Sequence, residues 1–144
     1  MEVQIANRQS KHRISKKKIH QTASVILNAL DCPEAELSIL IVDDQKIAQL
    51  NHQYLNREGP TNVIAFSMRQ GPFSDIAPNL LGDVVISADT AQQEAKIAGI
   101  STQDRFDQLL IHGTLHLLGY DHENSAAEAR KMEEKADELL KLLK

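Results

Sequence analysis

The stretch from Leu109 to His122, which reads L-L-I-H-G-T-L-H-L-L-G-Y-D-H, constrains this chain more than any other feature. It holds three of the six histidines, His112, His116 and His122. The first two share one face of a helix, because side chains four residues apart lie one turn above each other. Gly119 follows the last pair of leucines, at a place where a left-handed residue commonly ends a helix. The chain can then turn back and bring His122 towards the other two histidines.

Three imidazoles that converge and leave a fourth position open are the ligand set of a catalytic zinc site. A lone histidine in an apolar helix is more often a hydrogen-bonded core residue, but three within eleven residues favour metal binding. We therefore predict one Zn²⁺ ion held by His112, His116 and His122. Nickel, copper or another divalent transition metal is an alternative, since imidazole ligands suit several of them.

The predicted histidine helix is apolar around most of its circumference. At about 100° per residue, the two histidines share a narrow arc and the rest of the surface is aliphatic, which predicts a buried helix. Gly113 lies beside the histidines, where an alanine would stabilise the helix by about 1 kcal/mol. We infer that another part of the chain approaches the helix backbone there.

The histidine spacing also matches H-E-x-x-H-x-x-G-x-x-H, the pattern of the metzincin peptidases, except at one position. Gly113 stands where those enzymes have the glutamate that accepts a proton from water. Glycine has no group for this step. A peptidase-like hydrolase is therefore only a minor alternative.

Length and composition indicate the class of protein. A chain of 144 residues is expected to form a single domain over 1–144, long enough to bury a sizeable core. The single cysteine, Cys32, excludes an internal disulfide and fits a reducing compartment. Neither a signal peptide nor a membrane-spanning apolar run is apparent, so we expect a cytoplasmic protein with no membrane partner.

The charge is unevenly distributed. The net charge is −4, yet residues 1–20 hold six lysines and arginines against one acid, Glu2. This stretch either contacts a polyanion or is a solvated turn and helix start, and the sequence leaves both interpretations open.

Hydrophobic periodicity predicts strands near 3–5, 37–42, 63–68 and 82–87. Helices are expected over 16–30, from Asp43 to about 54, over 89–99, from a cap at Ser101 through the histidines, and from a capping box at Ser125 to 143. Residues 69–80 hold two prolines and read as a surface excursion. Strands in the first two thirds and helices in the last third argue for an α+β fold.

The segment H-G-T-L-H-L-L-G-Y-D-H resembles the signature of the YbeY family of bacterial endoribonucleases and ribosomal-RNA maturation factors. Leu50-Asn51 with the block P-T-N-V-I-A-F at 60–66, and L-G-D-V at 81–84, resemble two further family blocks in the same order. The resemblance implies a small mixed sheet of about four strands packed with about five helices, the metal-binding helix being central.

The resemblance also implies the activity and the partners. It predicts a zinc-dependent endoribonuclease, specific for single strands, that acts in ribosomal RNA maturation and ribosome quality control. The implied partners are single-stranded RNA, including small-subunit ribosomal RNA, and the ribosome. A non-catalytic, ribosome-associated assembly factor with a structural metal is the alternative from a different class.

Two more residues are candidates for the catalytic site. The resemblance places an arginine at the position of Leu55, and Arg57, two residues on, is our candidate to contact phosphate in its place. Asp121 precedes the third histidine, where it either orients an imidazole or accepts a proton; the first role is favoured.

Overall fold

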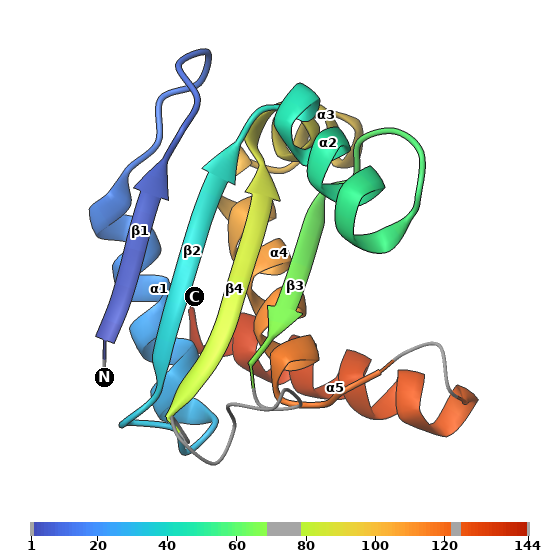
Figure 1. Cartoon of the computed structure of the whole chain (residues 1–144). Coiled ribbons are helices and arrows are strands. Elements are labelled where there is room, and N and C mark those ends of the chain that lie inside the picture. The colour runs from blue at the N-terminus through green and yellow to red at the C-terminus, as the bar shows by residue number, and fades with distance from the viewer. Residues whose placement is uncertain (1, 69–78, 122–124, 144) are drawn as a thin grey trace.

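The computed structural model describes residues 2–68, 79–121 and 125–143, which form four strands and five helices (Figure 1). In chain order these are β1 (Glu2–Asn7), α1 (Lys16–Ala29), β2 (Glu36–Val42), α2 (Asp44–Leu55), β3 (Val63–Ser67), β4 (Leu80–Ser87), α3 (Ala88–Ala98), α4 (Thr102–Leu117) and α5 (Ala126–Leu142). The predicted α+β class, with about four strands and about five helices, is confirmed. The predicted excursion at 69–80 lies outside the described residues except for its last two.

The strands form one mixed sheet in the order β1-β2-β4-β3. The first three of these run parallel, and β3 is antiparallel to β4. The two central strands, β2 and β4, carry the apolar runs I-L-I-V and V-V-I, which are typical of strands covered on both faces. The two edges of the sheet are therefore β1 and β3.

Helices cover both faces of the sheet, because alternate residues of each strand point to opposite sides. Ile39, Ile41 and Val84 pack in the larger core with the buried residues of α1, α4 and α5. Val85, on the other face, packs in a smaller cluster with Ile47 of α2. Figure 1 shows α1 and α4 behind the sheet, so that α4 crosses β4 and β3.

Local sequence fixes where the helices begin. Ser15, Asp43, Ser87, Ser101 and Ser125 each stand just before a helix, and each side chain accepts a hydrogen bond from the backbone N–H three residues on. These caps satisfy backbone donors that the first helical turn leaves unpaired. The predicted starts at Asp43, Ser101 and Ser125 are therefore confirmed.

Within the described part of the chain, no helix combines the length and apolar character needed to cross a membrane.

Candidate active site

Helix α4 presents a buried face to the sheet and a partly exposed stripe that holds the histidines. Leu110, Ile111 and Leu115 are all at most 2% exposed, as the apolar pattern predicted. Thr114 is fully buried, and its hydroxyl donates to the carbonyl of Leu110 at 2.7 Å, which satisfies the one polar group on this face. The core thereby holds the helix in one rotation about its axis.

Gly113 lies where α4 touches the sheet. A Cβ atom at this position would stand 2.7 Å from Cγ1 of Val84 and 3.3 Å from Cγ2 of Val63. The close approach predicted from the sequence is confirmed, and the partners are β4 and β3. A glutamate here would collide with the sheet, because the side chains of Val84 and Val63 fill the space that the metzincin base would need.

The imidazoles of His112 and His116 face one another. Their Nε2 atoms are 3.1 Å apart, and the ring planes are inclined at 76° with centroids 4.6 Å apart. In a tetrahedral site with metal–nitrogen bonds of about 2.0–2.1 Å, two ligand nitrogens lie about 3.3 Å apart. The two rings are thus spaced as ligands of one ion would be.

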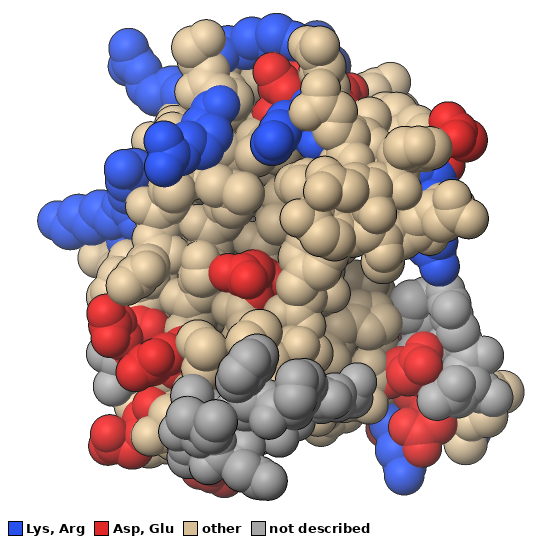
Figure 2. Space-filling model, viewed as in Figure 1, with Lys and Arg blue, Asp and Glu red and all other residues tan. Residues whose placement is uncertain are grey.

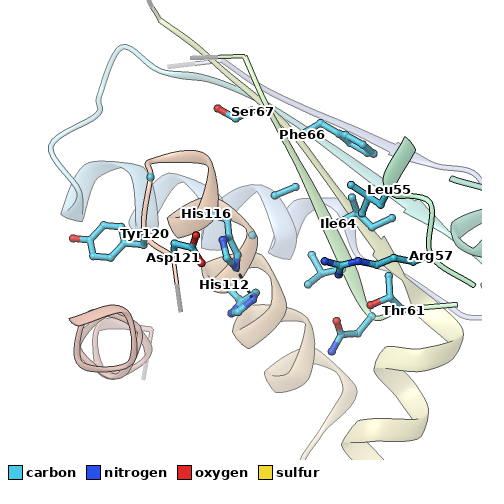
Figure 3. Close-up of a pocket in the computed structure, with 15 residues that line it drawn as sticks. Leu55, Arg57, Thr61, Ile64, Phe66, Ser67, His112, His116, Tyr120 and Asp121 are labelled. Carbon is cyan, nitrogen blue, oxygen red and sulfur yellow. Dashed lines mark hydrogen bonds between the residues drawn. The ribbon is translucent and has the colours of Figure 1, made fainter. Parts of the chain in front are cut away.

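The end of α4 turns the chain back towards these rings. Gly119 has a φ of +99°, its N–H donates to the carbonyl of His116, and the N–H of Tyr120 donates to that of Leu115. This is the paired-bond helix ending that glycine favours, and it confirms the stop predicted at Gly119. Asp121 follows, and Figure 3 shows its carboxylate directed at the two histidines.

A pocket of about 800 Å³ lies beside the histidines, between α4 and the edge strand β3. The loop from α2 to β3 closes its far side, and in Figure 3 the side chain of Arg57 reaches from that loop towards the histidines. Leu55 also lines this side. The pocket therefore brings together four of the five predicted site residues: Arg57, His112, His116 and Asp121.

The fifth, His122, lies outside the described residues. Among residues 2–68, 79–121 and 125–143, no group of three histidine, cysteine or acidic side chains is placed to hold a metal ion. The predicted three-histidine set thus remains a prediction.

Asn62 also lines the pocket; it belongs to the block at 60–66 that resembles the family, but the sequence favours an ordinary cap or turn role for it. Its side-chain amide donates to both carboxylate oxygens of Glu94 on α3, at 3.2 and 3.3 Å. Arg105 on α4 donates to the same carboxylate at 3.0 and 3.1 Å. This bridge fixes Asn62 against the histidine helix, and the bridge could not be read from residues so far apart in the chain.

The three remaining histidines lie elsewhere. His12 contacts Asp89, His52 pairs with Glu58 on the surface, and His20 is exposed on α1. None of them lines the pocket.

Comparisons with known proteins assign the family. The family model described as endoribonuclease YbeY matches residues 4–144. The chain belongs to the YbeY family. The Geobacter sulfurreducens protein named endoribonuclease YbeY is 51% identical over 99% of this chain and 96% of its own length. The Aquifex aeolicus protein of that name is 41% identical over 86% and 81%. The solution structure of TM1509 from Thermotoga maritima has a similar fold, with a TM-score of 0.64 and 20% identity over 96% of this chain and 86% of that one.

Proposed function

We propose that this chain is a zinc-dependent endoribonuclease of the YbeY family that cuts single-stranded RNA in the pocket between α4 and β3. The observation that carries the proposal is the facing pair of imidazoles, His112 and His116, at the spacing of two ligands of one ion. His122 would complete the set, two residues beyond the turn at Gly119. The whole chain, 1–144, would act as one domain.

The pocket residues divide the work on a phosphodiester. The histidines would hold a divalent ion, which when bound supplies positive charge to polarise a phosphoryl oxygen or to lower the pKa of water. Arg57 would donate to a non-bridging phosphate oxygen from the opposite side, as guanidinium groups do at phosphates. Asp121 would accept a hydrogen bond from an imidazole and so fix the ring.

The alternatives are weaker. Peptide hydrolysis requires a base at Gly113, where the sheet leaves no room for a side chain. A non-catalytic assembly factor with a structural metal needs no open pocket with a cation opposite the histidines. The family setting supports action in ribosomal RNA maturation and quality control, on small-subunit RNA at the ribosome, in the cytoplasm.

Replacing one ligand tests the proposal. His116→Ala should lose stoichiometric zinc and should stop cleavage of a single-stranded RNA by zinc-loaded protein. His20→Ala is the matched control, because it removes an exposed histidine from α1 without touching the pocket. Zinc content is measured by elemental analysis and cleavage by gel electrophoresis.

Each outcome separates the alternatives. Equal cleavage by His116→Ala and the parent would mean that the observed cleavage does not depend on the histidine site, as with a contaminating nuclease, and would leave the proposal without its activity. Zinc bound by the parent and by His20→Ala, with no cleavage by either, would favour the assembly factor.

Arg57→Ala should lower the rate of RNA cleavage at least tenfold while zinc binding stays unchanged, because a charged donor to the phosphate is lost. Arg57→Lys should keep part of the rate, and Leu55→Arg in the Arg57→Ala background should restore some of it. Single-turnover rates at saturating RNA measure the effect. An unchanged rate for Arg57→Ala would remove Arg57 from the site.

A further inference from the structure

Six exposed cationic side chains gather where β1 ends and α1 begins: Arg8, Lys11, Arg13, Lys16, Lys17 and Lys18. We call these residues the basic surface. The sequence has no acidic residue from Val3 to Leu30. Figure 2 shows lysine and arginine side chains projecting at the upper left, over this part of the fold. The rest of the chain is acidic enough to give a net charge of −4, so this face differs in sign from its surroundings.

The loop between β1 and α1, which carries Lys11 and Arg13 of the basic surface, is firmly held. The side chain of Gln9 donates to the carbonyl of His12 and accepts from the N–H of His12, both at 2.9 Å. His12 Nε2 lies 2.7 Å from a carboxylate oxygen of Asp89, and the amide of Asp44 donates to the other oxygen at 2.9 Å. The hydrogen bond from the Asp44 amide lowers the pKa of Asp89, and His12 and Lys11 lower it further, whereas burial raises it. The net effect is a lowered pKa, which keeps the Asp89 carboxylate ionised.

Most of these cations have no acidic partner in the part of the chain that the structure describes. Lys11 lies 3.4 Å from Asp89, but the other five form no ion pair within the described residues. Since their side chains are exposed, their charges remain available to a partner. A strongly positive, preformed surface of this kind attracts polyanions.

The charges at the start of α1 are unfavourable for a helix. The first turns of α2, α3, α4 and α5 each contain an acid, whereas α1 has none and begins with Lys16, Lys17 and Lys18. Positive charge at a helix N-terminus is unfavourable, because the backbone N–H groups there are themselves positive. Residues that contradict such a local preference without a structural gain are expected at positions that serve a function, and the three lysines at the start of α1 are of this kind.

The basic surface is separate from the histidine pocket. β1 and β3 are opposite edges of the sheet, and the basic residues adjoin β1 whereas the pocket adjoins β3. None of the six lines the pocket. Three strand spacings of about 4.8 Å separate the two edges, so an RNA of modest length reaches both.

We propose that the basic surface is a second RNA-binding site, which holds the phosphate backbone of a single-stranded substrate away from the point of cleavage. The inference rests on the proposed function, because that function makes the polyanion an RNA. Lysines and arginines bind phosphates through charge, without reading sequence. The site therefore adds affinity and orientation and leaves the choice of cleavage position to the pocket.

The test measures binding without cleavage. A fluorescent 30-nucleotide uridine-rich RNA is titrated with protein in a chelating buffer at several salt concentrations, and anisotropy gives the Kd. The variant is Lys16→Gln with Lys17→Gln and Lys18→Gln. The control is Arg130→Gln with Lys131→Gln and Lys141→Gln, which removes the same charge from exposed positions of α5.

Removing three phosphate contacts should lower the slope of log Kd against log salt concentration by about 2, since each contact with a single strand contributes about 0.7 to that slope. At low salt the variant should bind at least tenfold more weakly, and the α5 control should stay within twofold of the parent. The α1 variant should also melt at a slightly higher temperature, because three unfavourable charges leave the helix start.

Equal weakening in both triple variants would reduce the effect to total charge and overturn the proposal. An unchanged Kd in the α1 variant would also overturn it. Binding of the parent to anionic phosphatidylserine vesicles, with no binding to RNA, would assign the surface to a membrane instead. Since the assay contains no metal, its result is independent of whether His116→Ala abolishes cleavage.

Discussion

Gly113→Ala is expected to destabilise the protein and to weaken metal binding and RNA cleavage together. The added methyl group would lie 2.7 Å from Cγ1 of Val84, a fully buried side chain. Valine is stiff about χ1 and cannot swing aside, so α4 must move away from the sheet. Overpacking of this kind costs about 1–3 kcal/mol, against about 1 kcal/mol gained in helix propensity. The free energy of unfolding, from urea titrations, should therefore fall by up to about 2 kcal/mol.

A compensating substitution tests the cause. Val84→Ala alone should destabilise the core by leaving a cavity, but in the Gly113→Ala background it should restore part of the lost stability and of the zinc affinity. Such a favourable coupling is expected only for residues in direct contact. Strictly additive effects of the two substitutions would mean that the contact between α4 and β4 does not set the position of the histidines.

Gly82→Ala should have a larger effect on folding. Gly82 has a φ of +139°, and a Cβ atom there would overlap the carbonyl oxygen of Phe66 on β3. The strained backbone costs about 1–3 kcal/mol and the collision adds to it, so roughly 3–5 kcal/mol should be lost. That is a large part of the stability of an ordinary domain. Thermal unfolding followed by circular dichroism should show a midpoint lowered by about 10 °C or more.

Gly99→Ala is the matched control for this prediction. Gly99 also has a positive φ, +71°, but nothing lies within 4 Å of the place of its Cβ atom. This control should therefore show only the cost of a left-handed backbone, about 1–2 kcal/mol. Similar losses for the two variants would mean that the approach of β3 to Gly82 is unimportant.

Local patterns predicted the parts of the fold that depend on neighbouring residues. The period of the apolar residues predicted a buried α4 with the histidines on one stripe, and Gly119 predicted its end. The helix caps at Ser101 and Ser125 could also be predicted, because each side chain bonds to a backbone donor only three residues away. Boundaries shifted by one or two residues, as in β4, which begins at Leu80 because that residue pairs with Glu36 on β2.

Contacts across the sheet could not be predicted in the same way. The sequence indicated that something approaches Gly113, but only the strand order identifies Val84 and Val63 as the partners. The hydrogen bonds from Asn62 and Arg105 to the carboxylate of Glu94 join three separate parts of the chain. No spacing of residues in the sequence predicts them. Asn56 has a left-handed backbone conformation, which directs the loop that carries Arg57. No pattern of residues in the sequence predicted that conformation.

The strand order also has a consequence for synthesis on the ribosome. A chain made from its N-terminus can first assemble β1, α1 and β2 as one parallel unit. β3 follows, but in the finished sheet its strand partner is β4, and β4 is also the neighbour that joins it to β2. Until residues 80–87 have left the exit tunnel, β3 has nothing in the described sheet to pair with, and α4, which lies later in the chain, is not yet available to cover the sheet. Synthesis of β4 is therefore the step that joins β3 to the pair of strands made before it.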